Sequence, residues 1–174
     1  MQDLDIYKSN YLIIGAPNSK KSEVSRELSR KLNYKLINLD RTKYAFFNDF
    51  TDFDEEKYYS LIDRKGKLVA LNYIHKYEMN HLNYVIDNMD LNCVIDFGNT
   101  YLIIDDNALL NKLKLFDNIV LLSSNNNFRD EFNNKLKRNK ILEVLCTIKV
   151  DVDNKSVSDI VKEVLNHKKF KDVL

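Results

Sequence analysis

Glycine and proline are scarce in this chain of 174 residues, which contains three glycines and a single proline. The glycines are Gly15, Gly66 and Gly98, and the proline is Pro17. Both residue types have special backbone roles, so the few that are present are informative. Gly15 and Pro17 lie within three residues of each other, and Gly98 follows an apolar run. These positions are therefore the first candidates for a functional turn.

Cysteines, histidines and long apolar runs are also few. Cys93 and Cys146 lie inside apolar runs and are expected to be buried, inert thiols. Two cysteines and three scattered histidines suggest neither a disulfide framework nor a metal cluster. The longest apolar runs, such as YLII and IVLL, are far shorter than the roughly 20 residues of a membrane-spanning helix. The first ten residues predict no signal peptide, so we expect a cytoplasmic protein without a membrane partner.

An excess of one charge is absent too. The chain has 27 Lys and Arg against 26 Asp and Glu, a net charge of +1, which gives no sign of a nucleic acid-binding surface. Its length suits one domain, residues 1–174, that is large enough to bury a core. The sequence predicts no oligomeric state.

Five short apolar runs alternate with amphipathic helical patterns. The expected strands are residues 11–14, 35–39, 92–97, 118–122 and 145–150. The expected helices are residues 54–62, 67–88, 106–115, 129–136 and 140–142, with two more that begin near Ser19 and at the Ser156/Asp159 capping-box pattern. Residues 42–53 are aromatic and acidic without a clean period. This order predicts an α/β fold with three α/β/α layers around a five-stranded parallel sheet.

The first expected strand runs into a phosphate-binding pattern. The segment reads Gly15-Ala16-Pro17-Asn18-Ser19-Lys20-Lys21-Ser22, and a helix follows it. The P-loop pattern is G-x-x-x-x-G-K-[ST], and Gly15, Lys21 and Ser22 fill three of its four fixed positions. In such a loop the backbone N–H groups and the helix N-terminus hold phosphate. We expect residues 15–22 to bind ATP, with Lys21 on the β- and γ-phosphates and Ser22 on Mg²⁺.

Lys20 stands at the fourth fixed position, where the pattern has glycine. Glycine there lets the backbone approach phosphate without an intervening Cβ. A lysine either points to solvent and leaves its N–H usable, or crowds the site and prevents nucleotide binding. Asn18 is a milder departure, because asparagine tolerates left-handed backbone. An ordinary strand-turn-helix with fortuitous lysines is the alternative to a phosphate site.

Residues 11–40 resemble the opening of shikimate kinase-like P-loop proteins. In those proteins an acidic D-x-D follows the second strand, and here the triplet is Asn38-Leu39-Asp40. Residues 94–100, VIDFGNT, resemble the V-I-D-F-G-x-G-H-S stretch of a bacterial shikimate kinase-like, AAA-like ATPase group, and the later segments follow the order of that group. The resemblance implies the nucleotide kinase form of the P-loop NTPase fold. A G-G-G after the third strand and the arginines that grip the carboxylate of shikimate are not found, which argues against shikimate as the substrate.

Three further residues are candidates for the chemistry. The resemblance implies a role for Asp40 near Mg²⁺ or the acceptor hydroxyl, and the alternative is a helix or turn cap. Asp96 ends the third strand, where an acid can hold Mg²⁺ through water; the alternative is a buried carboxylate that caps a neighbouring N–H. Arg129 follows the fourth strand, where related kinases have a lid whose arginine neutralises the transferred phosphate; the alternative is a solvated helix face.

Two functions follow from these candidates. The first is an ATP- and Mg²⁺-dependent phosphotransferase that acts on the hydroxyl group of an unknown small-molecule acceptor. Lys21, Asp40 and Arg129 would be its catalytic residues, and Ser22 and Asp96 would hold the metal. The second is a degenerate P-loop protein that binds nucleotide weakly or not at all and acts as a binding or regulatory module. Lys20 and Asn38 favour the second function.

Overall fold

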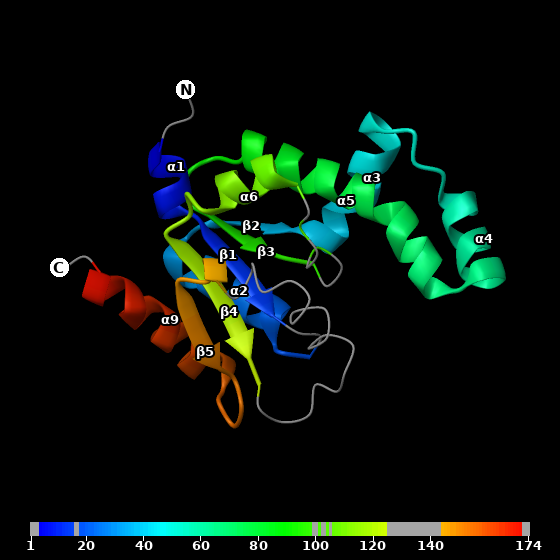
Figure 1. Cartoon of the computed structure of the whole chain (residues 1–174). Helices are drawn as coiled ribbons and strands as arrows, with labels where there is room; N and C mark the ends of the chain where they lie inside the picture. The colour runs from blue at the N-terminus through cyan, green and yellow to red at the C-terminus, as the bar shows by residue number, and fades with distance from the viewer. Residues whose placement is uncertain are drawn as a thin grey trace.

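The computed structural model describes residues 4–15, 18–98, 101, 104, 106–124 and 144–171 (Figure 1). Within these residues five strands form one sheet in the order β2-β3-β1-β4-β5, and every neighbouring pair is parallel. The strands are β1 (Tyr11–Gly15), β2 (Lys35–Asn38), β3 (Cys93–Asp96), β4 (Asn118–Ser123) and β5 (Ile148–Asp151). The expected five-stranded parallel sheet is confirmed.

Helices cover both faces of this sheet, as Figure 1 shows. They are α1 (Leu4–Ser9), α2 (Lys21–Leu32), α3 (Leu39–Phe50), α4 (Glu55–Lys65), α5 (Lys67–Asn88), α6 (Asn107–Leu113) and α9 (Val157–Lys171). None of the helices within the described ranges is long and apolar enough to cross a membrane.

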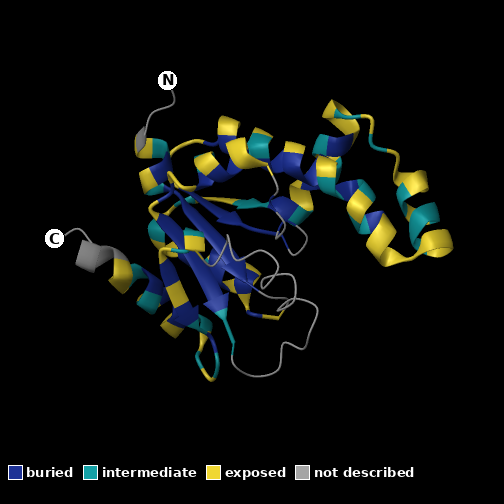
Figure 2. Cartoon of the chain, in the orientation of Figure 1, coloured by how far each residue is buried: buried dark blue, intermediate teal, exposed yellow. Residues whose placement is uncertain are grey.

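The side chains of β1 explain the three layers, because alternate residues of a strand point to opposite faces. Tyr11 and Ile13 pack in a core with the apolar sides of α2 and α9. Leu12 and Ile14 pack in a second core with α5 and α6. β1 is therefore buried on both faces (Figure 2), and a continuous apolar run is what such a central parallel strand requires.

An arm made of α3, α4 and the N-terminal half of α5 extends away from the sheet (Figure 1). Its small core consists of Phe47, Ile74 and Tyr77, with further aromatic rings packed against them. α4 has no fully buried residue, so this helix contacts its neighbours along one side only. The arm explains the unclear period of residues 42–53, because α3 packs on α5 and on aromatic residues of the arm as well as on the sheet.

The structure adds two helices to those expected and corrects the start of the last strand. Residues 42–53 show no clean period in the sequence, but α3 begins at Leu39 and ends at Phe50. The last strand begins at Ile148 and not at residue 145, because Val144 and Leu145 are helical. The short helix α1 has too few residues to show a period in the sequence. The capping box of α9 is confirmed, since the backbone N–H of Asp159 donates to Ser156 Oγ at 3.2 Å.

Candidate active site

The turn between β1 and α2 has the close approach that a phosphate-binding loop needs. Gly15 ends β1, and a Cβ at this position would lie 2.5 Å from Ser19 Oγ and 3.1 Å from Leu122 Cβ. A larger residue there would have to displace the Ser19 hydroxyl. The Ser19 hydroxyl is buried and has no hydrogen-bond partner among the described residues. Ala16 and Pro17, which we also expect to bind nucleotide, lie outside the described residues.

Two residues of the turn, Asn18 and Lys20, have left-handed backbone. Their φ angles are 66° and 60°, values that cost a non-glycine residue about 1–2 kcal/mol. Lys20 thus has the backbone shape of the glycine it replaces. Its side chain is exposed, and Nζ donates to the backbone oxygen of Lys155 at 2.7 Å, just before α9. Of the two alternatives for Lys20, the structure has the one in which the side chain lies on the outer surface.

Lys21, the first residue of α2, meets Asp96 at the carboxyl edge of the sheet. Lys21 is 6% exposed, and its Nζ lies 4.0 Å from Asp96 Oδ1. Burial lowers the pKa of Lys21, and the negative charges of Asp96 and Asp40 oppose that effect. The Ser25 hydroxyl donates to the backbone oxygen of Lys21 at 2.8 Å and closes the first turn of the helix. The ammonium group of Lys21 is thus positioned by two rigid elements, α2 and β3.

Asp96, the last residue of β3, is 2% exposed. Burial raises the pKa of Asp96, while a hydrogen bond from Ser22 and the charge of Lys21 lower it. Asp96 Oδ2 accepts a hydrogen bond of 2.6 Å from Asn38 Nδ2. Asp96 Oδ1 is buried and accepts no hydrogen bond from the part of the chain that the structure describes. The two expected metal ligands, Ser22 and Asp96, therefore lie side by side.

Ser22 and Asp96 can supply one hydroxyl and one carboxylate to a magnesium ion. No group of three or more His, Cys, Asp or Glu residues in the described ranges could hold a metal by itself. Mg²⁺ bound beside a nucleotide takes one or two carboxylates, phosphate oxygens and waters. Asp96 Oδ1, which accepts no hydrogen bond within the described residues, and the hydroxyl of Ser22 fit that ligand set.

Asp40 lies near Asp96 and close to the backbone after β3. A Cβ on Gly98 would collide with Asp40 Oδ1 and would lie 2.7 Å from its Cγ, so the glycine makes room for this carboxylate. The Asp40 side chain is 39% exposed, and its Oδ1 lies 3.4 Å from Lys43 Nζ. The N-cap of α3 is Asn38, whose side chain accepts from the Arg41 backbone N–H. Asn38, and not Asp40, is therefore the N-cap of α3.

Beside Asp40 lies a buried ion pair that the sequence patterns did not reveal. Lys43 Nζ is 3.1 Å from Glu78 Oε1, and both side chains are at least nine-tenths buried. Lys43 thus lies between the carboxylates of Glu78 and Asp40. The signal in the sequence is the three-residue spacing of Asp40 and Lys43, which places both on one side of a helix. It was not visible because α3 itself was not expected.

His81 is a second polar group in this interior. The residue is 1% exposed. Its Nδ1 lies 2.6 Å from the Tyr101 hydroxyl, and its Nε2 lies 3.2 Å from Thr42 Oγ1. Burial, together with the positive charge of Lys43, lowers the pKa of His81 to about 4. Burial raises the pKa of Tyr101, so the phenol keeps its proton and can donate it to His81.

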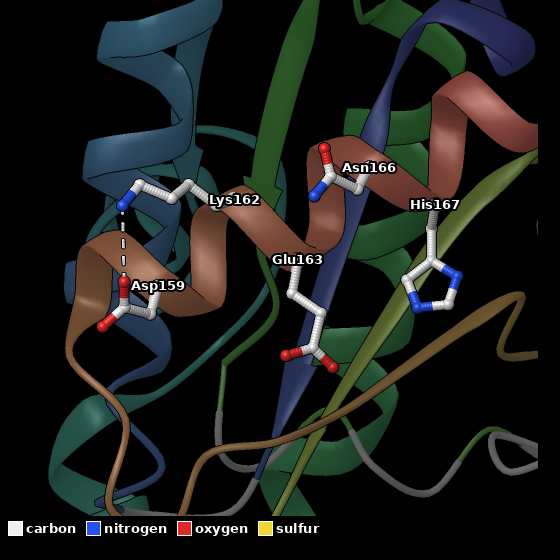
Figure 3. A pocket seen from close by; sticks show the side chains of 5 residues that line it. All are labelled: Asp159, Lys162, Glu163, Asn166 and His167. Atoms are coloured by element: carbon white, nitrogen blue, oxygen red, sulfur yellow. Dashed lines mark hydrogen bonds and ion pairs between the residues drawn. The ribbon is translucent and has the colours of Figure 1, made fainter.

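Two hollows lie apart from the Lys21 and Asp96 pair. The first, of about 270 Å³, lies along the exposed side of α9 (Figure 3), and its lining residues are Asp159, Lys162, Glu163, Asn166 and His167. The second, of about 410 Å³, lies between β2, α3 and α5, and its aromatic wall includes Phe46, Phe50 and Tyr84. The residues of the first come from one helix, and those of the second are mostly apolar. Neither brings together groups suited to phosphate. Arg129, the expected lid residue, lies outside the described residues.

No family model and no curated protein matches this sequence. Solved structures do match its fold. A shikimate kinase from Acinetobacter baumannii in complex with shikimate has a TM-score of 0.68 and 13% identity, and the match covers 97% of each chain. A shikimate kinase from Aquifex aeolicus has a TM-score of 0.63 and 23% identity, and the match covers 94% of this chain and 98% of the other.

A more distant match is the thymidylate kinase from Candida albicans, with a TM-score of 0.55 and 19% identity. That match covers 95% of this chain and 93% of the other. The fold is thus that of the P-loop kinases. Within that class the five-stranded sheet and its flanking helices are shikimate kinase-like, as the sequence predicts.

Proposed function

We propose that this protein is a small-molecule kinase that transfers the γ-phosphoryl group of ATP, in the presence of Mg²⁺, to a hydroxyl group of an acceptor. The observation that carries the proposal is the meeting of Lys21, Ser22 and Asp96 where β1 and β3 end. In parallel α/β sheets ligands bind beyond this edge. Lys21 and the N-terminus of α2 supply positive charge there, and Asp96 supplies a carboxylate oxygen without another partner in the described residues.

Each residue has a defined part in this proposal. Lys21 and the backbone N–H groups of the turn before α2 bind the phosphates and stabilise the charge that develops on them. Ser22 and Asp96 hold Mg²⁺, which neutralises phosphate charge when bound. Asp40 orients the acceptor hydroxyl and accepts its proton as the oxygen bonds to phosphorus and the bond to the β-phosphate oxygen breaks. Such catalysis rests mostly on positioning, and Gly98 and Lys43 hold Asp40 from two sides.

The alternative proposal is a degenerate P-loop protein that serves as a binding or regulatory module. It is favoured by the left-handed backbone of Asn18 and Lys20. At the position of Lys20 the P-loop pattern has glycine, which adopts this backbone without strain. The exposed side chain of Lys20 favours the kinase, because it lies outside the turn. Binding of ATP distinguishes the two.

The test is thermal unfolding with ATP and Mg²⁺, with ADP, and without ligand. Ligand at 100 times its Kd adds about 2.7 kcal/mol to the free energy of unfolding, so a kinase should show a clear rise in Tm. Lys21→Met, which keeps the aliphatic stem, should abolish most of the rise. Lys31→Met, on the same helix but in a surface ion pair with Glu27, is the matched control and should keep it. The absence of any shift at millimolar ATP would contradict the kinase proposal.

A further inference from the structure

The side-chain amide of Asn38 has a fixed orientation. Its Oδ1 accepts from the backbone N–H of Arg41 at 3.0 Å, as the N-cap of α3. Because the oxygen is used as an acceptor for the cap, Nδ2 is the end that lies toward Asp96. The register of the sheet also pairs Asn38 directly with Asp96. The donor is therefore presented to the carboxylate by both the helix cap and the strand pairing.

A chain of hydrogen bonds, which runs from the exposed Thr42 to the buried His81, supports the backbone of Asn38. The Thr42 hydroxyl donates to the backbone oxygen of Asn38 at 3.1 Å. Since this hydroxyl has a single hydrogen, it accepts from His81 Nε2–H, and His81 Nδ1 then accepts from the Tyr101 hydroxyl. The end of β2 is thus tied to α5 and to the segment after β3. Such a support keeps the side chain of Asn38 from turning away.

The two oxygens of Asp96 consequently differ. Oδ2 accepts from Asn38, and Oδ1 lies 4.0 Å from Lys21 Nζ without a hydrogen bond from any described residue. A buried carboxylate oxygen without a partner is costly, by about 1–3 kcal/mol or more. Asn38 donates to Oδ2, and Oδ1 lies on the side of the Lys21 ammonium group without a hydrogen bond from the described residues. That arrangement suits a carboxylate whose second partner arrives with a ligand.

Asparagine differs from the acid of the family pattern at this position in one decisive respect. A carboxylate at position 38 could still cap α3, but its second oxygen would face Asp96 Oδ2 at the 2.6 Å now occupied by a hydrogen bond. Two negative oxygens at that distance repel, and Asp96 would lose its orientation. The amide is thus the group that fits beside Asp96. Asn38 is therefore not the remnant of an acidic metal ligand.

We propose that Asn38 is a positioning residue that holds Asp96 as the single carboxylate for Mg²⁺·ATP, an inference that rests on the proposed kinase function. Asn38 does not touch the metal or the nucleotide in this scheme. It acts through the orientation of Asp96 Oδ1. Partners of this kind typically contribute 10- to 100-fold to metal affinity.

The test separates the metal-dependent part of nucleotide binding from the rest. Calorimetry measures the Kd of ATP with Mg²⁺ and of ATP with EDTA for wild type and for Asn38→Ser, whose serine keeps an N-cap but is too short to reach Asp96. We expect about a tenfold or greater rise in Kd with Mg²⁺ and no change with EDTA. Asp54→Ser changes the N-cap of α4, far out on the arm, and should alter neither value. An unchanged Kd for Asn38→Ser with Mg²⁺ would overturn the inference.

Asn38→Asp keeps the cap and provides the second arm of the test. We expect it to bind Mg²⁺·ATP more weakly than wild type, because the new carboxylate repels Asp96. Tighter binding would mean that position 38 is a ligand site that has lost its acid, and would overturn the inference. If wild type itself binds no ATP, the proposed function fails and this inference fails with it. If wild type binds ATP and the variants bind it equally well, the inference is wrong but the proposed function stands.

Discussion

The buried His81 makes stability depend on pH. Its pKa is lowered from 6.5 to about 4 in the folded protein, chiefly by burial and then by the charge of Lys43. The unfolded chain therefore takes up the proton first as the pH falls. The stability that neutral His81 contributes is fully present above about pH 6.5 and is lost as the pH falls from 6.5 to 4. A difference of about 2.5 pKa units at 1.36 kcal/mol per unit is a loss of about 3 kcal/mol.

The assay is urea unfolding between pH 4 and pH 7.5 for wild type and His81→Gln. The glutamine variant is less stable at pH 7, because it loses the bonds to Tyr101 and Thr42, but its stability should fall by about 3 kcal/mol less on acidification. His75→Gln, on the same helix but partly exposed, is the control for the loss of a histidine. Parallel pH profiles of wild type and His81→Gln would refute the reasoning.

Two further predictions concern the lysine residues Lys43 and Lys20. Lys43→Met should lower the free energy of unfolding, measured with urea, by about 3–5 kcal/mol, because it leaves Glu78 buried without a counter-charge. Glu78→Gln in the same chain should recover most of that loss. A double variant no more stable than the single one would contradict this account. Lys20→Gly should leave the Kd of ATP within a few-fold of wild type, because the side chain already lies outside the turn. A tenfold gain in affinity would show that Lys20 obstructs the loop.

Much of the fold could be predicted from local patterns. The apolar run of β1, followed by Gly15 and an amphipathic helix, is a short-range signal that remains visible in one sequence. The alternation of such units predicts a parallel sheet, and the match to solved shikimate kinases confirms it. The arm was harder to predict. α3 packs on more than one partner, so its aromatic residues do not follow a single stripe.

The candidate site, like the fold, was only partly predictable from local sequence patterns. Lys21 and Ser22 were predicted because they are adjacent to the turn that places them. Asp96 was predicted because it ends a strand. How Asp96 is oriented depends on Asn38, a residue 58 positions away that the register of β2 and β3 brings within 2.6 Å. Such a contact has no local pattern in the sequence.

The sequence by itself therefore determined the five strands and the position of the turn between β1 and α2, because both depend on residues that are close along the chain. Only the tertiary structure decided the direction of the Lys20 side chain, the burial of Lys43, Glu78 and His81, and the pairing of Asn38 with Asp96. All but the first of these features arise where the arm and the sheet meet. There the environment of each group is made by distant segments, and burial and hydrogen bonding set its chemistry.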